Sequence, residues 1–367
     1  MNYEAINFDT ETKSWADPSS PVCWRLAYVA HRFLRIAFVL TGFALFGPPL
    51  NAQDANKSSV PAPSRETYTY KTVGDCEIKA DVYRLPGDDV RPAILWIHGG
   101  ALMFGDRGTL AADQAERYLR AGYVIVSIDY RLAPESKLPA ILEDIDDAYR
   151  WLRENGPHLF HIAPDRIALV GNSGGGYLTL MAGYRLIPRP GALVSFYGYG
   201  DITSEWTTRP SKFYLEGDRI TKEDAEKAVG ERVLSESPIF PRVIFYNYCR
   251  QNGLWPKAVT TFDPETEPSK FEPFCPVRHI TKDYPPTMLL HGDQDSDVPF
   301  AQSQQMAAAL KQHNVPHQLL RMKGFDHLFD KFPKGWGPNA EPIGLKDPKV
   351  AEAFDQVVAF LNMHVGR

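Results

Sequence analysis

Apolar and polar residues follow two different periods along the chain from about residue 92 onward. Short, continuously apolar runs such as 93–97 and 167–170 are typical of strands that are buried on both faces of a sheet. Longer stretches with apolar residues three and four positions apart, such as 139–155, are typical of helices that cover a sheet. The alternation of the two patterns predicts an α/β fold with a mainly parallel central sheet flanked by helices.

The predicted elements follow one another in a regular order. A short antiparallel pair comes first, and each later strand is separated from the next by a helix or by a long insertion. We expect strands at 68–70, 76–83, 93–97, 123–128, 167–170, 192–196, 287–290 and 318–321, and helices at 110–121, 139–155, 174–184, 300–312 and 350–362.

Residues 200–283 interrupt this rhythm. They combine aromatic residues and prolines with charged, helix-like stretches such as 221–232. A structureless loop of this length is uncommon inside a compact domain. We therefore expect a mostly helical cap inserted between two strands, with residues 66–199 and 284–367 forming the core. Insertions of this kind shape substrate pockets.

Residues 1–65 differ in composition from the rest of the chain. Arginines precede an apolar run at 36–46, and small residues follow up to Ala52. This order is typical of a secretory signal peptide cut after Ala52, or of a membrane anchor, with a polar linker behind it. We expect a secreted, periplasmic or membrane-anchored protein. The alternative is a cytoplasmic protein in which this segment packs as a lid helix.

Charge and cysteine content exclude several classes of function. The net charge of −5 gives no basic surface for nucleic acid or acidic lipid. Four scattered cysteines are too few for a disulfide scaffold or a zinc site. Cys249 and Cys275 either pair with each other or remain buried free thiols. No cofactor or metal is expected.

Ser173 lies in the sequence Gly-Asn-Ser-Gly-Gly at 171–175, between a predicted strand and a predicted helix. This G-x-S-x-G pattern is typical of a sharp turn that exposes a nucleophilic serine above a sheet. Its glycines permit a backbone shape that other residues resist. A phosphate-binding loop would need a lysine and a different glycine spacing. We therefore predict that Ser173 is a nucleophile.

A nucleophilic serine needs a base, and the base needs a carboxylate that orients it. With this type of turn, the chain order is serine, acid, histidine. Asp295 and His327 each follow a predicted strand in that order. We predict that His327 is the base and Asp295 the acid, with Asp293 and Asp297 as alternative acids. Activity should then fall on acidification with a midpoint at about pH 6 to 7.

Acyl transfer also needs N–H donors for the negatively charged oxygen of the intermediate. His98, Gly99 and Gly100 directly follow a predicted buried strand, where a loop carrying such donors belongs. We predict an oxyanion hole formed by the N–H groups of Gly99, Gly100 and Gly174. His98 is expected to hold the loop by hydrogen bonding.

These motifs together resemble those of the hormone-sensitive-lipase-like carboxylesterases, which have the α/β-hydrolase fold. HGGA at 98–101 is similar to that family's HGGG, and DYRLAPE at 129–135 matches the family's DYRLAPE. GNSGGG stands where the family usually has GDSAGG. HGDQDSDVP at 291–299 instead resembles the acid motif of prolyl-oligopeptidase-like and acetylesterase-like members. The resemblance covers roughly residues 90–200 and 285–330.

The resemblance implies that DYRLAPE is mainly architectural, which makes Asp129, Arg131 and Glu135 candidates for supporting ion pairs. The expected activity is hydrolysis of small or medium carboxylic esters through an acyl-enzyme, with a small-molecule ester as substrate. An amidase, an aryl-formamidase or a peptidase could use the same triad. A non-catalytic binding module is a further alternative, against which the presence of His327 argues.

Overall fold

The computed structural model describes residues 62–335 and 340–366. The predicted leader, its cut after Ala52 and most of the predicted linker lie outside the described residues, as does Cys23. Within the described part, no helix has the combination of length and apolar character that crossing a bilayer requires.

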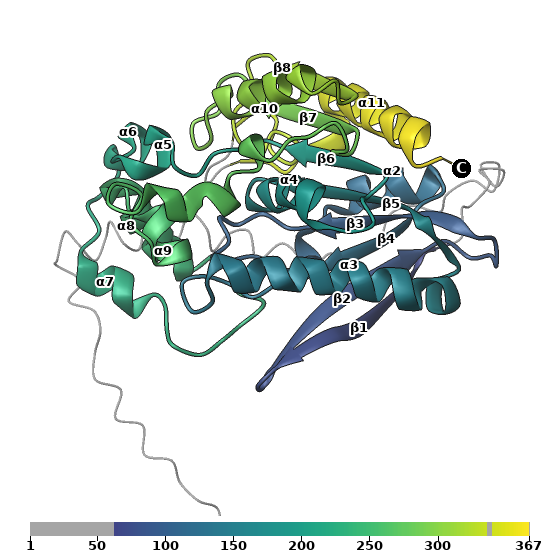
Figure 1. The fold of residues 1–367 in the computed structure, drawn as a ribbon, viewed down its shortest axis with the longest axis horizontal. Coiled ribbons are helices and arrows are strands. Elements are labelled where there is room, and N and C mark those ends of the chain that lie inside the picture. The colour runs from purple at the N-terminus through teal and green to yellow at the C-terminus, as the bar shows by residue number, and fades with distance from the viewer. Residues whose placement is uncertain (1–61, 336–339, 367) are drawn as a thin grey trace, which may run out of the picture. The chain divides into compact units, whose positions relative to one another are not determined.

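Eight strands form one sheet in the order β1-β2-β4-β3-β5-β6-β7-β8 (Figure 1). β1 and β2 pair antiparallel, as do β2 and β4, and every other neighbouring pair is parallel. The prediction of a mainly parallel sheet is therefore confirmed. The strands are β1 Ser64–Val73, β2 Cys76–Arg84, β3 Arg91–Ile97, β4 Val124–Ile128, β5 Ile162–Asn172, β6 Ala192–Phe196, β7 Thr287–Gly292 and β8 His317–Met322.

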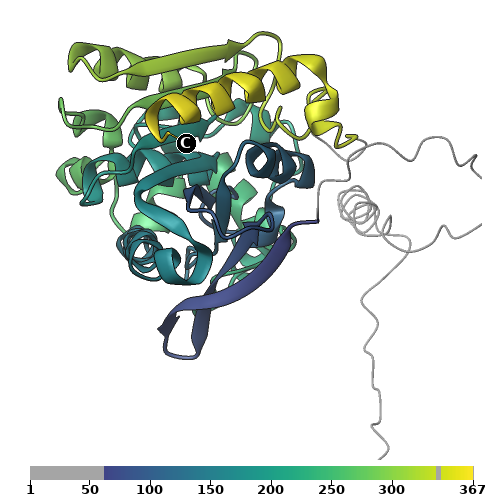
Figure 2. The same ribbon diagram turned by 90° about the vertical axis from the view of Figure 1, so that its right-hand side faces the viewer.

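Helices cover both faces of the sheet, which Figures 1 and 2 show from two directions. One apolar core joins the sheet to three flanking helices and to the segment between β6 and β7, and a second core joins the opposite face to two other helices. Because both faces are covered, the inner strands are mainly apolar, and all five residues of β4 are buried. The first face carries α3 Leu138–Phe160, α4 Gly174–Arg185 and α10 Ala301–Gln312, and the second carries α2 Ala112–Arg120 and α11 Pro348–His364.

Several element boundaries differ from the prediction, among them the starts of β1 and β5 and the end of α3. β1 begins at Ser64, inside the predicted linker, because the polar side chains of Arg65 and Thr67 bind Asp81 on β2 at 2.6 and 2.7 Å. α3 continues to Phe160 although glycine and proline follow Asn155. The side chain of Ile162 fills the space beside Gly156, where a Cβ would lie only 2.6 Å from it. Tertiary packing thus extends this helix beyond its sequence signals.

The segment between β6 and β7 contains several short helices and gathers at one end of the strands, on the left of Figure 1. It belongs to the same compact unit as the sheet. Its elements are α5 Glu205–Thr208, α6 Lys212–Leu215, α7 Lys222–Lys227, α8 Arg242–Asn252, α9 Trp255–Thr260 and two 3₁₀ segments at Pro268–Phe274 and Pro276–Arg278.

The cysteines of the described part do not form disulfides. Cys76, Cys249 and Cys275 are free thiols, and the last two are buried. The alternative of a Cys249–Cys275 bridge is therefore wrong. Burial raises the pKa of both thiols to about 12, so they are protonated and unreactive at neutral pH.

Candidate active site

Ser173 lies at the sharp turn between β5 and α4. Its backbone has φ +52° and ψ −120°, a conformation that residues with a side chain rarely adopt. Two hydrogen bonds hold it there. The N–H of Ser173 donates to Phe196 O at 2.9 Å, and its C=O accepts from Tyr177 N at 2.9 Å. The surrounding strand and helix thus fix the strained turn.

The glycines of the turn let α4 approach the sheet closely. A Cβ on Gly175 would lie 2.1 Å from Ile97 O, at the end of β3. A Cβ on Gly171 would lie 2.4 Å from Gly175 O. No side chain fits at either position, so the close packing requires glycine at 171 and 175, in addition to any requirement of the turn.

The structure brings the three residues of the predicted triad into contact. His327 Nε2 lies 3.1 Å from Ser173 Oγ, and His327 Nδ1 lies 2.7 Å from Asp295 Oδ2. Asp295 and His327 follow the adjacent parallel strands β7 and β8, which explains how residues far apart in the chain meet. Ser173 is 8% exposed and His327 4% exposed, so the site is largely shielded from water.

The alternative acids occupy other positions. Asp293 accepts hydrogen bonds from Arg321 Nε and from the N–H of Gly324, both at 2.7 Å. Asp297 Oδ2 lies 3.9 Å from His327 Nε2, at the nitrogen that faces the serine. Of the three candidates, Asp295 therefore has the position of an orienting acid.

A second histidine supports Asp295, and the sequence analysis did not identify it. His291 Nε2 lies 3.2 Å from Asp295 Oδ2 and 2.9 Å from Val298 O, while Ser303 Oγ lies 2.7 Å from His291 Nδ1. Because Nε2 faces two acceptors, it carries the proton, and Nδ1 accepts from the serine hydroxyl. The sequence signal for His291 is its position four residues before Asp295, at the start of the acid motif at 291–299.

The charges of His327 and Asp295 stabilise each other. Burial alone would raise the pKa of Asp295, but the charge of His327 and the hydrogen bonds from both histidines lower it well below its usual range. Burial alone would lower the pKa of His327, but the contact with Asp295 raises it above its ordinary value. The pair therefore favours a carboxylate beside a strongly basic imidazole.

The loop after β3 lies directly against the serine. Gly100 has φ +103°, and Met103 N donates to Gly100 O at 2.8 Å, which closes a tight turn. A Cβ on Gly99 would lie 3.3 Å from Ser173 Cβ, and one on Gly174 would lie 3.3 Å from the N atom of the loop residue Ala101. Gly99 thus lies next to Ser173, and Gly174 lies next to the loop that carries Gly99 and Gly100. Gly174 is also the first residue of α4, where N–H groups have no partner in the helix.

His98 holds this loop from the side of the core. Its Nδ1 lies 2.7 Å from Gly99 O, and its ring stacks on Tyr130 with a centroid distance of 4.2 Å. Burial lowers the pKa of His98 to about 4, so the ring is neutral and donates through Nδ1.

Each charged residue of the 129–135 motif forms an ion pair. All three carboxylates involved are buried. The pairs are Asp129–Arg107, Arg131–Asp144 and Glu135–Arg242.

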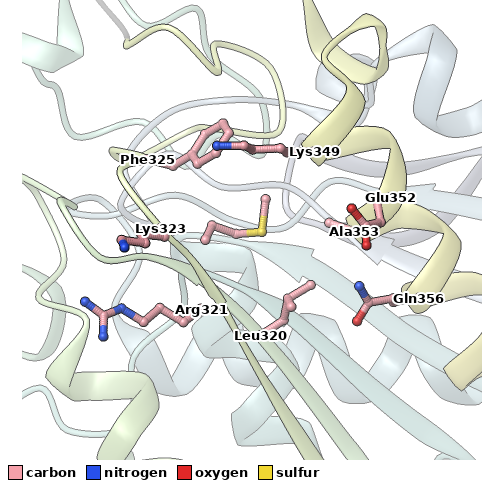
Figure 3. A pocket seen from close by; sticks show the side chains of 9 residues that line it. Leu320, Arg321, Lys323, Phe325, Lys349, Glu352, Ala353 and Gln356 are labelled. Atoms are coloured by element: carbon pink, nitrogen blue, oxygen red, sulfur yellow. The ribbon is translucent and has the colours of Figure 1, made fainter.

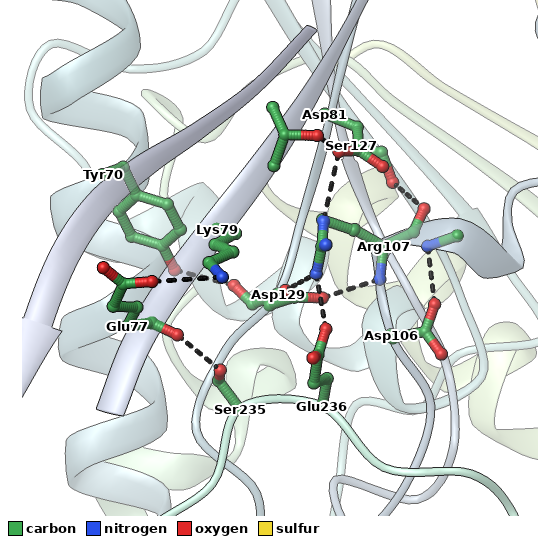
Figure 4. A network of polar contacts seen from close by, with 12 residues as sticks. Tyr70, Glu77, Lys79, Asp81, Asp106, Arg107, Ser127, Asp129, Ser235 and Glu236 are labelled. Atoms are coloured by element: carbon green, nitrogen blue, oxygen red, sulfur yellow. Dashed lines mark hydrogen bonds and ion pairs between the residues drawn. The ribbon is translucent and has the colours of Figure 1, made fainter. Parts of the chain in front are cut away.

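The first of these pairs is part of a larger network. Arg107 also pairs with Asp81 of β2 at 3.2 Å and with Glu236 of the insertion at 2.6 Å (Figure 4). Burial raises the pKa of Asp129 to about 7 despite the nearby guanidinium. The network joins the sheet to the insertion and does not touch the triad.

The insertion contributes two polar side chains near the triad. Tyr246 OH donates to Asp297 at 2.8 Å to Oδ1 and 3.0 Å to Oδ2, and Arg250 Nη2 lies 3.5 Å from Asp297 Oδ1. The ring of Tyr197 packs edge-on against His327 at 4.6 Å. No sequence pattern indicates a role for these residues.

A separate surface hollow of about 280 Å³ lies between β8 and α11 (Figure 3). No triad residue lines it, and Arg321, Lys323 and Lys349 give it a basic character. Among the residues that the structure describes, no cluster of three or more His, Cys, Asp or Glu side chains could hold a metal ion.

Comparison with known proteins places these features in a family. A family model described as alpha/beta hydrolase fold matches residues 94–331. Among solved structures, an esterase of Pyrobaculum calidifontis is 23% identical with a TM-score of 0.60, and the match covers 84% of this chain and 88% of that one. An alpha/beta hydrolase superfamily protein of Enterococcus faecalis is 22% identical with a TM-score of 0.63, covering 82% and 99%.

The curated relatives are much longer proteins. The non-reducing polyketide synthase Preu6 of Preussia isomera is 27% identical over 76% of this chain, and the synthase atr1 of Stereocaulon alpinum is 28% identical over 72%. The match covers only 14% and 12% of their lengths. With the family model, the sheet order and the serine turn in agreement, the chain belongs to the α/β hydrolase fold family, in its hormone-sensitive-lipase-like group.

Proposed function

We propose that this protein is a serine hydrolase that cleaves small or medium carboxylic esters through an acyl-enzyme. The observation that carries the proposal is the contact of His327 Nε2 with Ser173 Oγ at 3.1 Å, at a strained turn between strand and helix. The esterase among the solved structures supports the same reaction class.

In the proposed reaction, His327 takes the hydroxyl proton as Ser173 Oγ attacks the ester carbonyl. The carbonyl oxygen becomes negative and accepts hydrogen bonds from the oxyanion hole, formed by the N–H groups of Gly99, Gly100 and Gly174. His327 then gives its proton to the leaving alcohol. A water molecule, deprotonated by the same imidazole, attacks the acyl-enzyme. The intermediate then expels Ser173 Oγ, which takes the proton back from His327, and the acid is released. Asp295 holds the proton on Nδ1 throughout and keeps the ring oriented.

The same chemistry acts on other acyl compounds, so the test compares leaving groups. The panel is p-nitrophenyl butyrate, the butyryl thioester of N-acetylcysteamine, and butyranilide. We expect the highest kcat/KM on the oxygen ester. A higher kcat/KM on the anilide would favour the amidase alternative. A higher kcat/KM on the thioester would favour hydrolysis of thioesters.

Ser173→Ala tests the nucleophile. We expect kcat/KM on p-nitrophenyl butyrate to fall by about 10³-fold or more, because only binding and oxyanion stabilisation remain. Ser237→Ala is the matched control, since the hydroxyl that it removes donates to the O of the neighbouring Pro238 at 3.1 Å, and it should keep full activity. A fluorophosphonate should label the wild type at Ser173 and leave Ser173→Ala unlabelled. More than a tenth of wild-type activity in Ser173→Ala would contradict the proposal.

A further inference from the structure

A second carboxylate, that of Asp297, lies at the reacting centre. Its Oδ2 is 3.9 Å from His327 Nε2, the same nitrogen that contacts Ser173 Oγ. Asp295 contacts the opposite ring nitrogen, so the two acids differ in function although they are two residues apart. The side chain of Asp297 is 10% exposed, and it lies beside the ring nitrogen at which an ester bound to Ser173 would react.

The insertion holds this carboxylate in place. Tyr246 and Arg250 lie four residues apart on α8, and therefore on one face of the helix. The tyrosine hydroxyl donates to the carboxylate, and Arg250 binds both its Oδ1, at 3.5 Å, and the backbone O of Asp297, at 3.0 Å. The guanidinium is itself fixed over the rings of Trp206 at 4.9 Å and Tyr214 at 5.3 Å.

The carboxylate has more acceptor capacity than its neighbours use. A carboxylate offers about four acceptor sites. Among the described residues, Tyr246 supplies one proton, and Arg250 supplies one longer ion pair. Acceptor capacity therefore remains on Oδ2, the oxygen nearer His327. A desolvated acceptor gains stability from any donor that arrives with the substrate, and it repels a second carboxylate.

We propose that Asp297, fixed by Tyr246 and Arg250, forms a substrate subsite beside the scissile bond. This subsite accepts a hydrogen bond from a hydroxyl or ammonium group of the substrate and disfavours a carboxylate at the same place. The inference rests on the proposed esterase function and names its substrate class: esters that carry a hydrogen-bond donor close to the scissile carbonyl. If Asp297 only anchored α8, its replacement would not change the ratio of kcat/KM values between two substrates.

The test measures discrimination between matched esters. Dimethyl and monomethyl succinate differ by one negative charge on the acyl side, and methyl acetoxyacetate and acetoxyacetate differ by one on the alcohol side. In the wild type, we expect kcat/KM to be at least about tenfold lower for the anionic member of one of these pairs. Methyl 3-hydroxybutyrate should be cleaved faster than methyl butyrate, because it supplies the donor.

Asp297→Asn removes the charge and retains the shape of the side chain. It should reduce the discrimination against the anionic ester by about tenfold and should reduce the advantage of the hydroxylated ester. Tyr246→Phe is the matched control, because it removes a partner of the carboxylate and leaves the charge. The discrimination against anions should persist in that variant.

The outcomes separate the two proposals. Unchanged substrate ratios in Asp297→Asn, with normal turnover of neutral esters, would overturn the subsite and leave the esterase function standing. If Asp297→Asn does not fold, equal kcat/KM values within both charged pairs in the wild type would overturn the subsite without it. Absence of turnover of every ester, together with absence of fluorophosphonate labelling, would overturn the esterase function and the subsite with it.

Discussion

His327 lies between carboxylates that act on different ring nitrogens. Asp295 contacts Nδ1 at 2.7 Å, and Asp297 approaches Nε2 at 3.9 Å. Burial lowers the pKa of the imidazole. The negative charges of Asp295, Asp297 and Asp326 raise it by a larger amount, so the net shift is upward from 6.5. The groups near Nε2 also include the hydroxyl of Ser173, and Tyr246 and the cationic Arg250 bind Asp297.

The raised pKa determines the pH dependence of the proposed reaction. A general base must be neutral, so activity is present above the pKa of His327 and is lost as the pH falls through it. We expect the midpoint of kcat/KM on p-nitrophenyl butyrate to lie above the pH 6 to 7 that the sequence alone suggested, because the contacts of His327 raise its pKa to about 9. Asp295→Asn should lower both kcat and this midpoint. A profile measured from pH 5 to 9 and corrected for spontaneous hydrolysis would contradict the assignment if it were flat.

Sequence predicted the residues whose chemistry requires a fixed local pattern. The turn around Ser173 has a recognisable spacing, and the order of Asp295 and His327 follows from the strands that precede them. The partners of Asp297 have no such pattern. Tyr246 lies 51 residues away in the insertion, and only the packing of α8 brings it to the site. Functional residues that meet only through tertiary contacts of this kind cannot be predicted from the spacing of residues in the sequence.

At the scale of elements, the site depends on the contact of α4 with the end of β3. The first turn of the helix lies so close to the strand that Gly175 has no room for a side chain. This contact places the loop that carries Gly99 and Gly100 beside the nucleophile. The sharp turn and the proposed oxyanion hole are therefore consequences of one packing arrangement.

Gly175→Ala tests this arrangement. The new Cβ would lie 2.1 Å from the backbone O of Ile97, so α4 must move away from β3. We expect a loss of roughly 3 kcal/mol or more in the free energy of unfolding, measured with urea, at the upper end of the range for overpacking. Gly174→Ala is the comparison, because its Cβ would meet backbone atoms only at 3.2 Å and neighbours can adjust. Equal stabilities of the two variants would contradict the proposed close contact.

The sequence predicts which segments form strands and which form helices, but it predicts their first and last residues less well. The inner strands are apolar because both faces of the sheet are covered, which gives a pattern visible in the sequence. The edge strand β1 is polar, and its pairing depends on hydrogen bonds of its side chains to Asp81. The end of α3 depends on Ile162, which packs beside Gly156. Local signals indicate neither contact.

At the scale of the whole described unit, the insertion and the core are joined by buried polar contacts. Arg242 of α8 pairs with Glu135 at 2.7 Å, and both side chains are almost fully buried. The same guanidinium donates to the backbone O of Met103, in the loop after Gly100. Trp255 Nε1 donates to the O of Ala101 in that loop at 3.1 Å. The insertion therefore supports the loop that carries the proposed oxyanion donors.

Arg242→Met should affect stability and activity together. It leaves the carboxylate of Glu135 buried without its partner, which typically costs about 3–5 kcal/mol, and it frees the carbonyl of Met103. We expect a lower urea midpoint and, at temperatures where the variant is folded, a lower kcat with a smaller change in KM. The double variant Arg242→Met/Glu135→Leu should regain stability, because no buried charge remains unpaired, but it should not regain kcat.

An exposed ion pair of the insertion provides the control. Arg209 and Glu265 lie 2.8 Å apart, and their side chains are 65% and 62% exposed, so Arg209→Met should change neither stability nor kcat measurably. Unfolding should follow a single transition for wild type and control, whether tryptophan fluorescence or loss of activity is measured, because core and insertion share one unit. Normal kcat in a folded Arg242→Met variant would show that the loop keeps its position without the insertion, which would contradict the coupling.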